Sequence, residues 1–231
     1  MNFTNLANTF TIFGNFAVFD EESIALINNL YAHANINIMD ENNPEQRRLN
    51  KSGRLMQIIN KEKHETIILR PNRIDIQLPG IQDDKKEVVL KEVEDTFNIL
   101  IQIFEASFAS RIAYVGSFFT FDDEGTNMQI FSSRLDFLNY NSTPKELSIR
   151  TNNIENIENE DTNIVFNLNN ILISPNTASA VKRRAIMVTF DINTVPNEIM
   201  ERFNLNELMP YFNAYFDIVK EKIDNLKKID F

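Results

Sequence analysis

The hydrophobic pattern of the chain alternates between the two-residue period of strands and the longer period of helices. A stretch rich in phenylalanine, isoleucine and valine predicts a strand over Thr9–Phe19. Asp20 follows as a candidate N-cap, with two glutamates in the first turn of the helix that it would begin. An apolar stripe later predicts a long amphipathic helix over Asp84–Phe108. Between these helices, short alternating stretches predict three strands, at Leu55–Asn60, Glu65–Arg70 and Arg73–Leu78.

The second half of the chain repeats this order of elements. A strand over Arg111–Phe121 precedes Asp122, which begins a turn into a helix that carries Phe131, Leu135 and Leu138 on one side. The last helix is expected over Asn206–Lys228, with a proline in its first turn, where the missing N–H costs little. Three strands are predicted before it, at Glu146–Ile154, Asn163–Ile173 and Arg184–Asp191. Each half therefore reads strand, helix, three strands, long helix.

The two halves also share residues. Thr11–Glu22 aligns without gaps on Ala113–Glu124, and a glycine, two phenylalanines, an aspartate and a glutamate coincide. Gly14 and Gly116 would then mark two strands that bend alike. We therefore expect an α+β fold of pseudo-duplicated β-α-β-β-β-α units. They would form a curved, mainly antiparallel sheet of about eight strands with the helices on one face, a TATA-binding-protein-like saddle. Residues 1–109 and 110–231 would form the two halves, packed as one compact unit.

The first strand of each half is apolar on both of its faces. A strand with water on one side should alternate apolar with polar residues. One interpretation is that both strands lie at the centre of the sheet and that a loop covers the second face. The other is an apolar patch for a protein partner or a second copy of the chain. The candidate partner-binding residues are Phe13, Phe16, Tyr114, Phe118 and Phe119.

Composition mainly removes classes of function. The chain of 231 residues has a net charge of -10, no cysteine and two histidines. It therefore has no disulfide framework and no cysteine-based zinc site. The acid excess makes nucleic acid and membrane surfaces unlikely partners. No apolar run is long enough for a membrane-spanning helix, and the first residues do not resemble a signal peptide, so we expect a cytoplasmic protein.

Candidate catalytic chemistry is sparse. The acidic groups Asp20–Glu22 and Asp122–Glu124 could hold a metal or act as acid and base, but acids also favour helix starts on electrostatic grounds alone. We find no catalytic motif and expect no cofactor and no metal. Arg111 and Arg150, with Tyr114, are the alternative contacts for a small anionic ligand. The arginines in or next to predicted elements could instead pair with core acids: Arg70, Arg73, Arg111, Arg134 and Arg150.

Several stretches carry a resemblance to a known family. They are Arg111–Gly116, Ala185–Ile192, and Asn206–Leu208 with the helix that follows. In these the chain resembles a sporadically distributed bacterial family of uncharacterised proteins of about this length. The patchy occurrence of that family implies a link with mobile elements or phage conflict, and it supplies no catalytic residues.

From residues and resemblance together we expect a non-enzymatic protein-interaction module, with a role in bacterial phage defence or counter-defence. Two alternatives remain open. One is a small anionic ligand-binding module, and the other is an acidic mimic of nucleic acid that inhibits a nuclease or repressor.

Overall fold

The structure, a computed structural model, has an α+β fold built on one large antiparallel sheet. It describes residues 2–16, 20–32, 34–40, 54–61, 64–80, 85–105, 108–122, 124–133, 146–173, 183–197 and 202–228. In these parts of the chain, nine strands form the main sheet and two short strands form a second one. The sheet order β2-β3-β4-β5-β1-β7-β10-β9-β8 is open at both ends.

The elements have the following bounds. The strands of the main sheet are β1 (Thr4–Phe13), β2 (Asn35–Asp40), β3 (Arg54–Asn60), β4 (Glu65–Arg70), β5 (Arg73–Pro79), β7 (Arg111–Phe121), β8 (Ser148–Ile157), β9 (Glu160–Ile173) and β10 (Arg183–Thr194). The short strands are β6 (Phe108–Ala109) and β11 (Phe203–Asn204). The helices are α1 (Glu21–Leu30), α2 (Lys86–Phe104), α3 (Thr126–Ser133) and α4 (Met209–Lys227), and a single 3-10 turn spans Leu205–Glu207.

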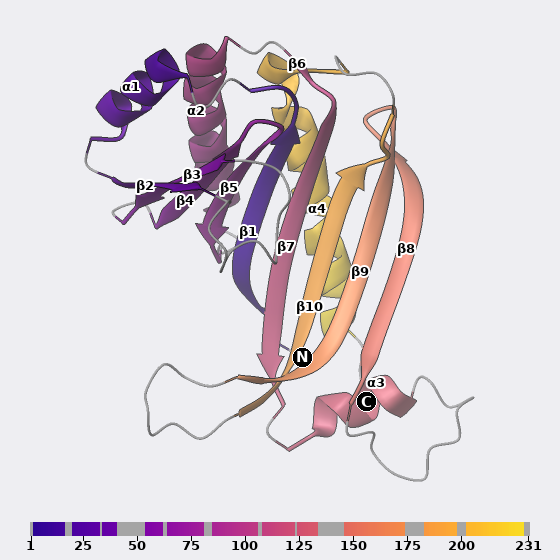
Figure 1. The fold of residues 1–231 in the computed structure, drawn as a ribbon. Helices are drawn as coiled ribbons and strands as arrows, with labels where there is room; N and C mark the ends of the chain where they lie inside the picture. Colours follow the sequence, from indigo (N-terminus) through magenta and orange to yellow (C-terminus); the bar gives the residue numbers. More distant parts are fainter. Residues whose placement is uncertain are drawn as a thin grey trace.

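The centre of the sheet is the antiparallel pair β1 and β7, which joins the two halves of the chain. Phe10 lies opposite Tyr114, and Phe13 lies opposite Arg111. On the outer side of β1 follow β5, β4, β3 and β2, and on the outer side of β7 follow β10, β9 and β8 (Figure 1). Each adjacent pair is antiparallel, which the short connections between most strands favour.

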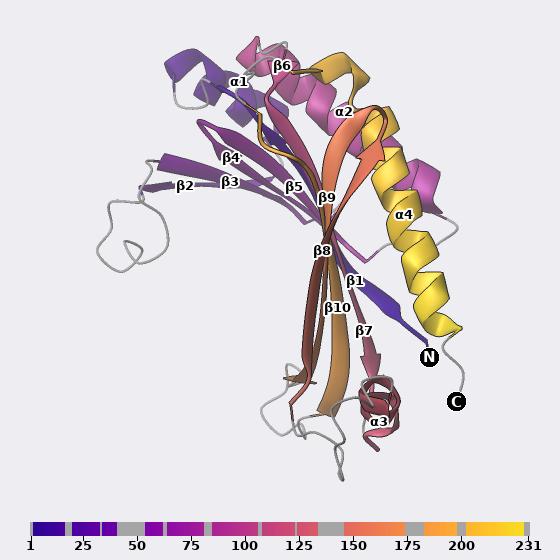
Figure 2. The ribbon, with the colours of Figure 1, turned by 90° about the vertical axis from the view of Figure 1, so that its right-hand side faces the viewer.

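The helices α2 and α4 lie on the same side of the sheet (Figure 2). Phe212 of α4 stacks on Phe97 of α2, with ring centres 5.7 Å apart, and meets Phe10 of β1 edge-on at 5.3 Å. All three rings are almost completely buried. Since alternate residues of a strand point to opposite faces, Phe10 and the residues in step with it line the core, and their neighbours line the other face. We call that other face the open face, and Figure 1 views the sheet from it.

The acidic residues before two helices act as caps. The carboxylate of Asp20 accepts hydrogen bonds from the backbone N–H and the hydroxyl of Ser23, which confirms the predicted start of α1. Asp122 is buried and accepts from the backbone N–H groups of Asn127 and Met128 at the start of α3. Both carboxylates therefore have a structural role at a helix start. Leu135 and Leu138, which were expected on that second helix, lie outside the described residues.

Three predictions about elements were wrong in detail. The first half contains a further strand, β2, so it has four strands after its helix where three were expected. β1 ends at Phe13, so Gly14 lies after the strand, whereas Gly116 lies in the middle of β7. The two glycines therefore do not occupy equivalent positions in two bent strands. α2 ends at Phe104, and Phe108 belongs to β6 with 43% of its surface exposed. Residues 17–19 of the first expected strand lie outside the described part of the chain.

Candidate functional site

The five aromatic residues proposed as a partner surface do not share one face. Phe16 and Tyr114 are buried, with exposed fractions of 2% and 0%, so the prediction that a partner touches them was wrong for both. The Tyr114 hydroxyl donates to Asn8 Oδ1 at 2.7 Å, and its ring lies 6.1 Å from that of Phe216 on α4. Phe118 is in step with Tyr114 and faces the helices. The rings of Phe16, Tyr114 and Phe118 therefore pack on the core side of the sheet and not on the open face.

Phe13 and Phe119 do lie on the open face, because they alternate with core residues of β1 and β7. Both are partly buried. They lie far apart along the central strands, because Phe13 is opposite Arg111 while Phe119 is opposite Thr4. These two residues therefore do not form one patch, and the aromatic neighbour of Phe119 is Phe121, at 5.3 Å between ring centres.

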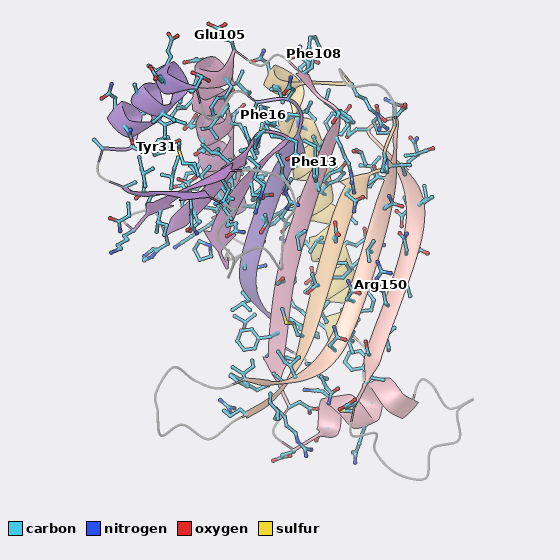
Figure 3. The ribbon with its side chains drawn as sticks, viewed as in Figure 1. Phe13, Phe16, Tyr31, Glu105, Phe108 and Arg150 are labelled. Atoms are coloured by element: carbon cyan, nitrogen blue, oxygen red, sulfur yellow. The ribbon has the colours of Figure 1, made fainter. Side chains whose placement is uncertain are left out.

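The two arginines proposed to hold an anionic ligand are also separated. Arg111 begins β7, whereas Arg150 lies on the outer strand β8 and is exposed. Arg150 is in register with Asn167 of β9 and, through β10, with Ser117 of β7. Figure 3 shows Arg150 well away from Phe13, the neighbour of Arg111. Tyr114 points to the opposite face, so these three residues cannot contact one small ligand together.

Arg111 instead has other arginines as neighbours. Strand register places Arg70 of β4 opposite Arg73 of β5, Arg73 opposite Phe13, and Phe13 opposite Arg111. We call these four residues the arginine row. Its positive side chains approach the ring of Phe13, with the Cζ atoms of Arg73 and Arg111 at 5.2 and 5.0 Å from the ring centre. The row crosses four adjacent strands of the open face.

One carboxylate next to the row fixes its first two arginines. Asp75 is buried and accepts from Arg70 Nη1 at 2.9 Å, Arg73 Nε at 2.7 Å and the Thr11 hydroxyl at 2.6 Å. This agrees with the expectation that Arg70 and Arg73 pair with a core acid. The Arg73 side chain is still 40% exposed, and in the described part of the chain only its Nε atom makes a hydrogen bond. Its terminal nitrogens remain available to an anion.

Arg111 is held from the other side of the row. Its Nε donates to the carbonyl oxygen of Thr194 at 3.1 Å and its Nη2 to Asn193 Oδ1 at 2.6 Å. Burial lowers the pKa of Arg111, the charge of Asp191 raises it and the charge of Arg73 lowers it further. An arginine nevertheless stays protonated at neutral pH. The neighbouring positive charge means that an added anion would relieve repulsion between Arg73 and Arg111.

The open face carries many polar residues. Across the central strands it carries Thr9, Thr11, Ser117, Asn163, Asn167, Thr189 and Asn193, all at positions that alternate with core residues. In the described strands its charged residues are Arg70, Arg73, Arg111, Arg150 and Arg183 against Asp75, Asp161 and Asp191. Val115, Phe119, Met187 and Val165 share this face with the polar residues, so the expectation of an apolar patch stays a prediction. A chain with a net charge of -10 has a face on which arginines outnumber carboxylates.

The described residues contain no group of three or more histidine, aspartate and glutamate side chains placed to hold a metal ion. In the same part of the chain, no helix has both the length and the apolar character needed to cross a membrane. The polar groups of the open face include guanidinium, amide and hydroxyl groups, which supply hydrogen bonds and positive charge. A guanidinium group binds a carboxylate or phosphate through two parallel N–H···O hydrogen bonds.

The sequence contained part of this site. Arg111 was singled out, and Arg70 and Arg73 were noted as pairing arginines, but their alignment in one row depends on the register of four strands. A hairpin with Arg70 and Arg73 on either side of Pro71-Asn72 was the available signal, because residues that flank a tight turn lie opposite each other. Arg134 lies outside the described residues.

The chain was compared with known protein families and with curated proteins. A scan against models of protein families finds no match. A search of curated proteins finds no match either. The resemblance to a sporadic bacterial family therefore stays a prediction.

Proposed function

We propose that this chain is a non-enzymatic interaction module whose open sheet face binds an acidic segment of another protein, with the arginine row as the anchor. The observation that carries the proposal is the register of Arg70, Arg73, Phe13 and Arg111 across adjacent strands. Two guanidinium groups that share one aromatic neighbour form a preorganised site for carboxylates. The surrounding amide and hydroxyl groups would add hydrogen bonds to the backbone of the same segment.

Charge favours a protein partner over nucleic acid. The excess of arginines on the open face is local, whereas the whole chain carries a net charge of -10 and would repel a long polyanion. A short acidic segment meets only the local field, since exposed charges beyond about 8 Å are screened at physiological salt.

The acidic-mimic alternative has less support. A mimic of nucleic acid needs a continuous row of negative charge, but three of the acids on the helical side pair with lysines. Lys86 binds Asp217, Lys91 binds Asp95, and Lys222 lies 3.5 Å from Glu155. A role in phage defence or counter-defence stays a prediction based on the resemblance alone.

The duplicated, saddle-like arrangement is also part of the proposal. It is supported by the pairing of β1 with β7, the first strand of each half, and by the helix, the three or more strands and the long helix that follow each of them. In such an arrangement the open face would be the concave surface around the arginine row. A partner segment could then contact residues from both halves at once.

The test uses fluorescence anisotropy at low salt with three labelled probes: an oligo-glutamate peptide, an oligothymidylate of equal net charge and an oligo-lysine peptide. The proposal expects saturable binding of oligo-glutamate, weaker binding of oligothymidylate and no binding of oligo-lysine. Arg73→Gln should weaken that binding about tenfold, because it removes one of the two guanidinium groups over Phe13. Lys91→Gln is the control, since it removes the same charge from an exposed position on α2.

Each other outcome counts against the proposal. Tighter binding of oligothymidylate would assign the face to nucleic acid. Absence of binding by any anionic probe, or equal weakening by Arg73→Gln and Lys91→Gln, would remove the arginine row as the anchor. Arg73 is the better site for substitution than Arg111, because Arg111 bonds to both Thr194 and Asn193. Arg73, in contrast, bonds only to Asp75 in the described part of the chain, and Asp75 keeps Arg70 and Thr11 as partners.

A further inference from the structure

A cavity of about 500 Å³ lies beside α4, on the side of the sheet opposite the arginine row. It is bounded by the beginning of β1, by β7 and by the C-terminal half of α4. Figure 2 shows that this part of α4 runs next to the beginning of β1. The volume falls in the range of about 300–1,000 Å³ that is usual for small-molecule sites. This cavity is unrelated to the partner surface proposed above.

The lining of the cavity is part apolar and part polar. Phe118 of β7 and Phe216, Val219 and Ile223 of α4 form its apolar part. Tyr114 lies at its base, where burial raises the pKa of the phenol and the hydroxyl is already bonded to Asn8. Tyr114 is therefore neutral and contributes a flat aromatic surface.

Gly116 leaves room for the two aromatic rings at the base of the cavity. A Cβ atom on Gly116 would lie 2.9 Å from the Tyr114 hydroxyl and 3.1 Å from the Phe118 ring. Both rings therefore lean over the backbone of β7 at this point. A larger residue at position 116 would push them into the cavity.

Charged groups line one side of the cavity. Lys220, Asp224 and Lys227 line it from successive turns of α4. A hydrogen bond from Lys227, at 2.9 Å, lowers the pKa of Asp224, and the charges of Lys227, Lys220 and Lys228 lower it further. The carboxylate is thus ionised at neutral pH and balances one of the two lining lysines. One positive charge remains beside the apolar part of the lining.

The other flank of α4 offers an internal comparison. A second cavity of about 420 Å³ lies there, lined by Phe166, Phe190 and Leu226 among others. Its lysine, Lys222, lies 3.5 Å from Glu155 and is balanced by that carboxylate. The two cavities are similar in size, but Lys222 has an ion-pair partner, whereas within the described residues Lys220 of the first cavity has none.

We infer that the first cavity binds a small amphipathic monoanion, a carboxylate or sulfonate with a short aliphatic or aromatic body. The body lies between Phe118, Phe216 and Ile223, and the anionic group lies near Lys220. The single excess charge favours a monoanion over a phosphate dianion. The apolar walls favour a ligand with a hydrophobic body over a free inorganic anion.

The experiment exploits the absence of tryptophan from the chain. Phe118→Trp places a single fluorescent reporter in the wall of the cavity, at a partly exposed position. Octanoate should shift its emission saturably, whereas octylamine, with the same apolar body and the opposite charge, should not. Lys220→Glu should weaken octanoate binding about tenfold. The matched control, Lys222→Glu, makes the same change of charge on the other flank and should leave it unchanged.

Three results would overturn the inference: octylamine that binds as tightly as octanoate, equal effects of the two lysine substitutions, or a shift that does not saturate. Anilinonaphthalene sulfonate, added to the chain with its natural Phe118, gives a second readout. It should bind saturably and be displaced by octanoate, and failure of either would also count against the cavity as a site. Binding of oligo-glutamate to the open face is a separate measurement, so the two proposals can fail independently.

Discussion

Arg73 and Arg111 approach the same aromatic ring from two different strands, with their Cζ atoms 5.2 and 5.0 Å from the centre of Phe13. Two like charges this close would repel each other in the absence of the ring. The face of an aromatic ring carries negative potential and offsets part of that repulsion. Phe13 therefore has a structural reason to be aromatic that the hydrophobic pattern alone did not reveal.

Replacing Phe13 by leucine tests this relationship. Phe13→Leu keeps an apolar residue but removes two cation–π contacts, so we expect the free energy of unfolding to fall by about 1 kcal/mol. The loss should be smaller at high salt, because screening also weakens the repulsion between the two arginines. Urea denaturation at two salt concentrations measures both effects. A loss that is independent of salt would mean that only apolar area matters at this position.

Asp75 is the carboxylate on which the open face depends most. It accepts from Arg70, Arg73 and Thr11 and is almost fully buried. Asp75→Asn keeps the size but removes the charge, and we expect a loss of about 1–3 kcal/mol in unfolding free energy. The partly exposed arginines can recover hydration, which keeps the loss below that of a fully buried pair.

A matched control for Asp75→Asn lies on the same strand. Gln77 is exposed on the open face, and Gln77→Ala should change the unfolding free energy by no more than about 0.5 kcal/mol. Equal losses in the two variants, measured by urea denaturation, would show that Asp75 is not the centre of the network.

Tyr114 was expected at a partner surface and instead belongs to the core. Tyr114→Phe removes the hydroxyl that donates to Asn8 Oδ1 and leaves that buried oxygen without this donor. We expect a loss of about 1–2 kcal/mol in unfolding free energy, with no change in the binding of oligo-glutamate. Weaker binding of oligo-glutamate at unchanged stability would instead show that Tyr114 contributes to the partner surface.

How far the sequence predicts this molecule depends on the range of the interactions. Local signals were sufficient for Asp20 as an N-cap and for β7, whose predicted bounds match the structure. β2 was missed although Asn35–Asp40 alternates polar with apolar residues, because the stretch is short and follows directly on α1.

The candidate site depended on longer-range information. Phe13 and Tyr114 have similar local patterns, and only the packing of α4 decides which of them is buried. The arginine row needs the register of β4, β5, β1 and β7, which is set by pairing across residues distant in the chain. The sequence identifies the arginines one by one, but it does not show that they lie next to one another across four strands.

The cap of α1 should make stability depend on pH in a defined direction. Hydrogen bonds from the Ser23 N–H and hydroxyl hold the pKa of Asp20 below its usual value of 3.8. The group binds its proton more weakly in the folded than in the unfolded chain, so its stabilising effect is present above the unfolded pKa. The effect is lost as the pH falls through the lower, folded-state pKa.

Asp20→Ala should therefore be less stable than the natural chain at neutral pH, and the difference should shrink in strong acid. Asp20→Asn is the control, because an asparagine caps a helix without titrating. Urea denaturation of the three chains over a range of acidic pH values gives the comparison. A difference between Asp20→Ala and the natural chain that stays constant with pH would show that the charge of Asp20 is not involved.

Phe212 connects the two halves of the chain. It packs on Phe97 from the first half and on Phe10 of β1, while it belongs to α4 of the second half. Together with the pairing of β1 and β7, this contact predicts that residues 1–109 and 110–231 unfold in one cooperative transition. Phe212→Ala should lower the unfolding free energy by about 3–5 kcal/mol, because the ring is fully buried and its removal leaves a cavity.

Circular dichroism and tyrosine fluorescence should give coincident urea transitions for both the natural chain and Phe212→Ala. Phe212→Leu, which fills more of the space, should cost less than the alanine variant. Two separate transitions in the natural chain would show that the halves are independent domains. Separation only in Phe212→Ala would show that this single ring, more than the β1–β7 pairing, couples them.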